Sequence, residues 1–200
     1  MINNISGWAI FLIATLVYLL TPEPTAGFWD CGEFITSAFK LEVGHPPGNP
    51  VFMLIQNLFC KFAGGDPGKV AIWINSWSAI ASGLCIMFLY WTITHLAAKI
   101  RLKTVEDYTP LNILIVTGSG IIGALAYAFT DTFWFSAVEG EVYATSSLII
   151  AFIFWTMLKW EEQADERGAN RWLMLDNFRS NFGRLAELEG SLNKLFPKEK

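Results

Sequence analysis

The sequence predicts an all-α polytopic membrane protein with about four transmembrane helices, and two observations support this prediction. Hydrophobic residues make up 53% of the 200 positions and charged residues only 16%, whereas an ordinary soluble domain carries about 25% charged residues. The apolar residues also gather in long uncharged stretches, and a helix that crosses a bilayer needs about 20 of them. Interfacial helices in the first outer loop and an amphipathic C-terminal helix complete the predicted architecture.

Four stretches meet or approach the length of a membrane span. The first lies within an uncharged run at the N-terminus, and we interpret it as an anchor because no Lys or Arg precedes it as in a signal peptide. A cleavable signal peptide is the alternative for this stretch. The third contains three glycines, which let neighbouring helices approach closely. The predicted spans are residues 8–20, 70–98, 111–130 and 142–158.

A basic turn sets the predicted orientation. Lys99, Arg101 and Lys103 follow the second span, and basic clusters in short loops favour the cytoplasmic side. Both termini are therefore expected in the cytoplasm of an inner (plasma) membrane, and residues 21–69 and 131–141 in the periplasm or a lumen. The apolar run 51–62 is too short and polar to span and is predicted to be an interfacial helix.

Charge and cysteine content exclude several classes of protein. A net charge of −4 gives no basic surface for nucleic acid. Three cysteines stand far apart without a C-x-x-C pair, so no disulfide framework and no metal site is predicted. Phosphate-binding loops and soluble hydrolase motifs are absent from the sequence.

The first outer loop carries the first pair of candidate acids. If a helix begins near Asp30, then Asp30 and Glu33 share one of its faces beside Trp29, in a partly apolar site where a carboxylate could act as a base. An equally good interpretation is a helix cap, in which Asp30 accepts backbone N–H bonds and Glu33 reaches back. Trp29 could stack on a sugar ring or anchor the chain at the membrane boundary.

His45 is the candidate ligand-positioning residue of the same loop. It precedes two prolines, which hold a backbone extended and would present the imidazole from a stiff segment. A polar residue in a tight connection between two helices is the alternative.

The second outer turn places two more acids at the mouth of the fourth span. Glu139 and Tyr143 would share a helix face, whereas Glu141 would point nearly opposite, so only one acid is expected to face a central cavity. Carboxylates at this depth are costly unless they face protein or water. At least one of them is therefore predicted to line a wet site, with solvated loop acids as the alternative.

The order of these motifs resembles that of GT-C glycosyltransferases. FWDCGEF at 28–34 is followed by GHPPGNP at 44–50 and SAVEGEVY at 136–143. More closely, the chain resembles the N-terminal part of large bacterial membrane proteins related to the eukaryotic transmembrane protein O-mannosyltransferase. The likeness runs from about residue 8 to residue 172.

The resemblance implies transfer of a sugar, with mannose one candidate, from a polyprenyl-phosphate donor to a hydroxyl acceptor such as a protein Ser or Thr at the outer face. It implies that Asp30 removes the acceptor proton, with Glu33 beside it, and that His45, Glu139 and Glu141 orient the substrates. Membrane lipid, the lipid-linked donor, and a protein acceptor or partner subunit are the implied partners, and no further cofactor is implied. Outside the membrane, His45 and the following lysines could meet the leaving phosphate: Lys40, Lys61 and Lys69.

The chain is predicted to divide at about residue 172. Residues 1–172 form the N-terminal part of a GT-C-like transmembrane domain, and residues 173–200 an amphipathic cytoplasmic tail with apolar side chains every three or four positions. Since the family continues with more membrane helices, a truncated or split member is expected. Two other functions compete with an enzyme: a non-catalytic membrane module that docks a partner through the tail, and a small transporter subunit.

Overall fold

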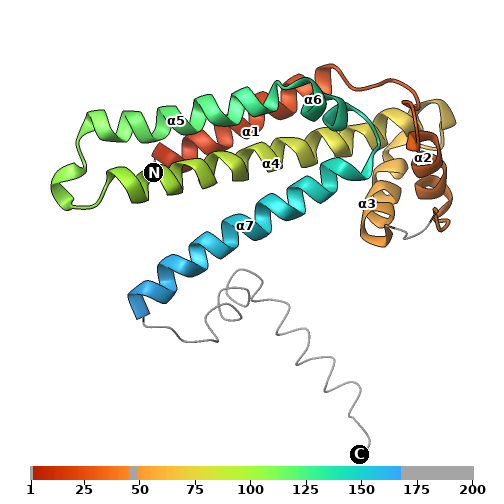
Figure 1. Cartoon of the computed structure of the whole chain (residues 1–200). Helices are drawn as coiled ribbons and strands as arrows, with labels where there is room; N and C mark the ends of the chain where they lie inside the picture. The colour runs from red at the N-terminus through yellow and green to blue at the C-terminus, as the bar shows by residue number, and fades with distance from the viewer. Residues whose placement is uncertain (1, 46–48, 168–200) are drawn as a thin grey trace, which may run out of the picture. The chain divides into compact units, whose positions relative to one another are not determined.

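The computed structural model describes residues 2–45 and 49–167 of the chain, with side chains as far as residue 162. The chain divides into two compact units, residues 1–155 and 156–200, which are considered separately. All regular structure in the described residues is helical (Figure 1). The α-helices are α1 (Ile2–Leu20), α2 (Cys31–Lys40), α3 (Pro50–Cys60), α4 (Val70–Arg101), α5 (Pro110–Ala128), α6 (Asp131–Val138) and α7 (Val142–Arg167).

Four of these helices are long and apolar enough to cross a membrane, which confirms the all-α polytopic fold class. The candidate spans are Ile2–Leu20, Pro67–Arg101, Pro110–Ala128 and Val142–Glu162. Each contains one of the predicted spans or overlaps most of it. The chain is therefore a multi-pass membrane protein. The sides on which its loops lie remain a prediction.

The first unit is built on α1, α4 and α5, which pack side by side along most of their lengths (Figure 1). Their mutual approach depends on small residues: a Cβ at Gly120 would meet the ring of Tyr90 at 2.8 Å. The Tyr18 hydroxyl donates a hydrogen bond of 2.7 Å to the carbonyl of Ala128. This bond joins the C-terminal ends of α1 and α5, so the two segments that follow them begin close together.

A second group of helices covers the outer end of α4. Here α2 packs on α3, and both pack on α4 (Figure 1). Asn57 of α3 donates 2.8 Å to the carbonyl of Ala38, near the end of α2. The predicted interfacial helix is thus present as α3, and its buried face forms a small core with α2 and α4: Phe34, Ala38, Phe52, Met53, Cys60, Ala63, Val70 and Ile74.

The second outer segment differs from the prediction of a simple turn. It contains a short helix, α6, which ends at Val138. A short connection that bends at Glu139 and Gly140 then leads to α7, which begins at Val142. Thr130 and Asp131 precede a mostly apolar stretch that contains Phe133, Trp134 and Phe135, and this order is a usual start signal for a helix.

In the second unit, the structure describes only the end of α7. Lys159 and Glu162 form an ion pair of 2.8 Å, at the i and i+3 spacing that suits a helix. The amphipathic tail predicted for residues 173–200, and the docking function attached to it, lie outside the described residues.

Candidate functional site

The loop from α1 to α2 is held against the outer ends of α4 and α6. The buried Asn75 side chain donates hydrogen bonds to the carbonyls of Glu23 (2.6 Å) and Thr25 (3.1 Å). The Glu23 amide donates 3.0 Å to the carbonyl of Val138 at the end of α6. Residues more than 100 positions apart thereby become neighbours, and the acids of the two outer segments share one site.

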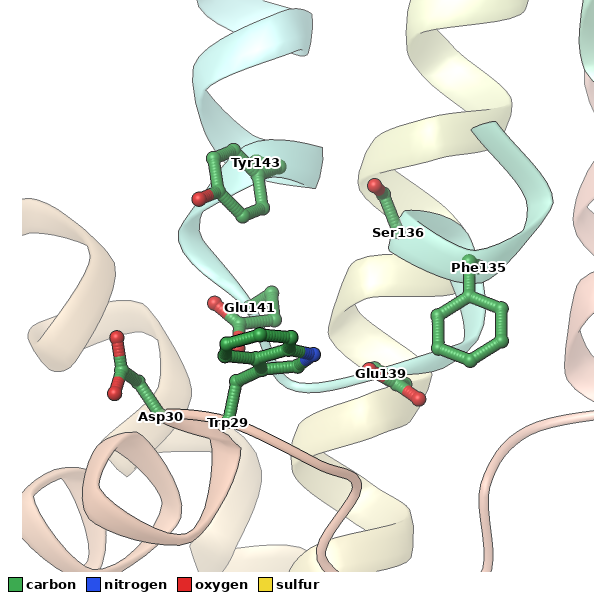
Figure 2. Close-up of a pocket in the computed structure, with 7 residues that line it drawn as sticks. All are labelled: Trp29, Asp30, Phe135, Ser136, Glu139, Glu141 and Tyr143. Atoms are coloured by element: carbon green, nitrogen blue, oxygen red, sulfur yellow. The ribbon is translucent and has the colours of Figure 1, made fainter. Parts of the chain in front are cut away.

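That site is a cavity of about 380 Å³. Figure 2 shows that its side chains come from the start of α2, from α6 and from the connection into α7. Three are acids, three are aromatic, and one is a hydroxyl. The described residues that line it include no Lys or Arg: they are Trp29, Asp30, Phe135, Ser136, Glu139, Glu141 and Tyr143.

Asp30 stands at the rim of the cavity, on the residue that precedes α2. It is the N-cap residue, yet its side chain makes no capping hydrogen bond. The capping-box interpretation of Asp30 and Glu33 is therefore wrong, because the Asp30 carboxylate faces the cavity rather than the backbone of α2 (Figure 2). An exposed carboxylate without a backbone partner at this end of α2 is free to accept a proton from a bound hydroxyl.

Trp29 has a conformation that bulky residues rarely adopt. Its φ is +58°, in the left-handed region where an L side chain crowds the backbone. Its side chain is 93% exposed and lies over the cavity (Figure 2). Strained residues of this kind concentrate at functional sites. An exposed indole ring offers a flat apolar face to a ligand.

Glu33 and His45 pair with each other instead of lining the cavity. One oxygen of Glu33 accepts the His45 backbone amide at 2.7 Å and lies 3.1 Å from His45 Nδ1. The bond from the backbone amide lowers the pKa of Glu33 below its ordinary value, with the imidazole adding to the effect. The expectation that Glu33 lies beside Asp30 at one site is not met, because Glu33 pairs with His45 of the α2–α3 loop and is not among the residues that line the cavity.

Glu139 and Glu141 both line the cavity, so the expectation that only one can do so is wrong. That expectation assumed a helix through both residues. The helix instead ends at Val138 and Glu139 has an extended backbone, with φ −118° and ψ 154°. The chain then bends at Gly140, where the Glu141 amide donates 2.9 Å to the carbonyl of Glu139. Both carboxylates are nearly buried, at 7% and 8% exposure.

Burial raises the pKa of both glutamates. For Glu139 the loss of water is the largest cause, and the neighbouring carboxylates of Glu141 and Glu23 add to it. For Glu141 burial is again the largest cause, with Asp30 the neighbouring acid. The cavity thus holds two acids that resist ionisation beside an exposed one, an arrangement in which acid and base roles can be divided.

Three residues that support the site were missed in the sequence. Cys31 is fully buried and its thiol lies within hydrogen-bonding distance of both glutamates. A Cβ at Gly27 would stand 2.7 Å from the carboxyl carbon of Glu139, so either that carboxyl group or the loop would have to move to accept a side chain there. Asn75 lies inside an apolar span, where a polar side chain is costly unless it has a partner. Its position in the sequence could therefore have marked it as a residue of the site.

Tyr143 keeps its predicted place at the cavity, on the first turn of α7. No group of three His, Cys, Asp or Glu side chains in the described part of the chain is arranged to hold a metal ion. The lining offers a ligand the carboxyl groups of three acids, the hydroxyl groups of Ser136 and Tyr143, and aromatic faces. These groups suit a molecule with several hydroxyl groups.

Comparison with known proteins identifies relatives of this chain. The family model described as the protein O-mannosyl-transferase TMEM260 N-terminal domain matches residues 30–182. Protein O-mannosyl-transferase tmem260 of Dictyostelium discoideum is 24% identical over 144 residues, which is 72% of this chain and 16% of that protein. Protein O-mannosyl-transferase TMEM260 of Mus musculus is 25% identical over 154 residues, 77% of this chain and 19% of the mouse protein.

The chain thus spans less than a fifth of the length of these two relatives. No solved structure matches it. The matched region contains the start of α2, α6 and the connection into α7, and so it contains six of the seven residues that line the cavity and begins one residue after Trp29.

Proposed function

Because the chain belongs to the family of the protein O-mannosyl-transferase TMEM260 N-terminal domain, we propose that it is the N-terminal part of a GT-C type membrane glycosyltransferase. The proposed reaction transfers a hexose, with mannose the leading candidate, from a polyprenyl-phosphate donor to a hydroxyl acceptor such as a protein Ser or Thr. The proposed site is the cavity at the outer face.

One observation carries the proposal: acids from two distant outer segments line a single cavity together with three aromatic side chains. Carboxylates accept hydrogen bonds from sugar hydroxyls, and the faces of Trp29 and Tyr143 offer apolar surface to a sugar ring. Both rings are exposed, at 93% and 62%, so they are available to a ligand.

Asp30 is the proposed general base. It takes the proton of the acceptor hydroxyl, the acceptor oxygen forms a bond to the anomeric carbon of the donor, and the bond from that carbon to the phosphate oxygen breaks with its electron pair leaving on the phosphate. Attack opposite the leaving group inverts the anomeric centre. A general base contributes about 10² to 10⁴ in rate.

The negative charge of the cavity favours binding of the sugar of the donor and disfavours binding of its phosphate. Asp30, Glu139 and Glu141 would repel a phosphate, and the described lining residues include no cation. Two of the predicted phosphate partners already pair with acids outside the cavity: Lys40 with Glu42 at 3.8 Å and Lys69 with Asp66 at 3.4 Å. The cavity therefore suits the sugar and the acceptor hydroxyl, and the phosphate belongs outside it.

Sugar transfer in membranes that carry the chain tests this function. The donors are labelled polyprenyl-phosphate hexoses, and the variants are Asp30→Asn and Asp131→Asn. Asp131 is an exposed acid at the start of α6 that is not among the residues lining the cavity, so it controls for loss of an outer charge. We expect Asp30→Asn to lower the rate by about 100-fold or more and Asp131→Asn to leave it unchanged.

Equal membrane levels of the three proteins, measured by immunoblot, are the control for insertion. Absence of transfer by the parent chain at normal membrane levels would contradict catalysis by this chain alone. Equal rates for the parent and Asp30→Asn would contradict the proposal, because another group would then be the base.

A further inference from the structure

Cys31 connects the two buried acids of the cavity. Its Sγ atom lies 3.2 Å from Oε1 of Glu141 and 3.6 Å from Oε2 of Glu139. The thiol is the first residue of α2 and is completely buried. Two carboxylates from the α6–α7 connection therefore converge on one sulfur atom from another part of the chain.

A thiol has a single proton, so Cys31 can donate to only one of these carboxylates at a time. Burial raises the pKa of Cys31 well above its ordinary range, so the thiol keeps this proton. Two ionised carboxylates that meet in one nearly buried site repel each other, and this repulsion favours a proton on one of them.

The surrounding charges increase this repulsion. Glu23 of the α1–α2 loop acts on Glu139, and Asp30 acts on Glu141. Among the described residues, His45 has the opposite effect, because it favours ionisation of Glu141. The balance of the neighbouring groups is negative.

We propose that Cys31 is a positioning residue that holds Glu139 and Glu141 as a proton-sharing pair, with one carboxyl group protonated at neutral pH. Such a pair offers a ligand both a donor, the carboxylic O–H, and acceptors, the carboxylate oxygens. A sugar hydroxyl also both donates and accepts, so the pair matches it better than two carboxylates would. This use of the pair rests on the proposed function, whereas the shared proton does not.

Infrared spectroscopy detects the shared proton without any enzymatic assay. A protonated carboxyl group has a C=O stretch that is separate from the bands of the carboxylate and the amide backbone. The purified full chain in lipid nanodiscs is titrated, and difference spectra are taken against Glu139→Gln and Glu141→Gln. Glu106→Gln is the control, since Glu106 is an exposed acid in the α4–α5 loop.

We expect a protonated carboxyl band in the parent at pH 7, lost in Glu139→Gln and in Glu141→Gln and kept in Glu106→Gln. Cys31→Ala should move the titration of the remaining band to higher pH, because a hydrogen bond to the carboxylate form is lost. Cys31→Ser should restore the parent midpoint, since a hydroxyl can donate in place of the thiol. Absence of the band in the parent, or a midpoint that neither substitution of Cys31 moves, would overturn the proposal.

The pH profile of sugar transfer gives the second readout. A residue that only fills space would tolerate Cys31→Ala, whereas a positioning residue should show a shifted profile in Cys31→Ala and rescue by Cys31→Ser. A shared-proton band without sugar transfer would leave this inference standing and would contradict catalysis by this chain alone. Sugar transfer without the band would overturn this inference and leave the proposed function standing.

Discussion

The two outer segments of the chain each carry a pair of closely spaced acids, and the structure gives the pairs opposite environments. Asp30 and Glu33 are both exposed and point apart, one to the cavity and one to His45. Glu139 and Glu141 are both buried and converge on Cys31. The pKa of Glu33 is lowered, whereas the pKa values of the second pair are raised.

The backbone explains this difference. Residues three apart at the start of a helix need not share a partner outside it, and here Glu33 is drawn to the α2–α3 loop. Glu139 and Glu141 stand on a bend between α6 and α7, in which the Glu141 amide donates 2.9 Å to the carbonyl of Glu139, and both side chains reach Cys31. Spacing in the sequence therefore predicts which acids act together only when the local conformation is known.

The largest effect on sugar transfer, among the variants that test this difference between the two pairs, is expected from Gly27→Ala. Its new Cβ would stand 2.7 Å from the carboxyl carbon of Glu139, so the acid or the loop must move. A displacement of about 1 Å at a reacting centre costs about 100-fold in rate. In the matched control Gly32→Ala the nearest atom is 4.0 Å away, and we expect the parent rate of sugar transfer. Equal rates for both variants would show that the position of Glu139 is unimportant.

A smaller effect is expected for the strained residue at the start of the first pair. Trp29→Gly removes the strain of a left-handed backbone, which is worth about 1–2 kcal/mol, so the variant should unfold at higher denaturant concentration while sugar transfer falls. Trp29→Phe keeps both the strain and an aromatic face and should lie near the parent in both measurements. A less stable Trp29→Gly variant would argue against the strain.

Glu33→Gln should change sugar transfer by less than about fivefold, since an exposed ion pair contributes little. Its partner His45 is also exposed, and neither side chain is among those that line the cavity. Comparison of the transfer rates of Glu33→Gln and Asp30→Asn shows which acid of the first pair takes part in the reaction. A loss as large as that of Asp30→Asn would return Glu33 to the catalytic role that the sequence suggested.

The smallest effect is expected in the pH dependence of stability, and its sign differs between the pairs. Glu139 and Glu141 have raised pKa values, so the folded state binds more protons and stability falls as pH rises from their ordinary value of 4.5 through the raised values. Glu33 has a lowered pKa, so its contribution is present above 4.5 and is lost as pH falls through the lowered value.

Denaturant unfolding at several pH values measures both contributions. Glu139→Gln should reduce the loss of stability on the alkaline side of 4.5, and Glu33→Gln should reduce it on the acidic side. Identical pH profiles for the two variants would contradict the opposite environments of the two pairs.

Much of the fold follows from local composition. The uncharged runs predicted all four candidate spans, and the helix expected near Asp30 begins at Cys31. These features depend on residues that are close in sequence. The interfacial helix was predicted on the same basis, and α3 occupies its place.

The site was less predictable because it is made by contacts over long distances in sequence. The three acids of the cavity, Trp29 and Tyr143 could be named in advance, but Phe135 and Ser136 were not. The bond from Asn75 to the α1–α2 loop and the meeting of Cys31 with Glu139 could not be predicted either. The helix α6 was missed, and with it the bend after Val138 from which both glutamates reach Cys31. No periodic pattern in the sequence around Cys31 indicates that its thiol contacts the two glutamates.

Occupation of the outer cavity by the donor is the central claim, and cysteine labelling tests it most directly. The native cysteines are buried, so a membrane-impermeant maleimide should report on Ser136→Cys, within the cavity, and on the control Val43→Cys, which replaces a side chain 93% exposed in the first outer loop. We predict that both label from outside intact cells, and that polyprenyl-phosphate mannose slows only Ser136→Cys. Labelling that requires permeabilised cells, or donor that protects both sites or neither, would contradict the account.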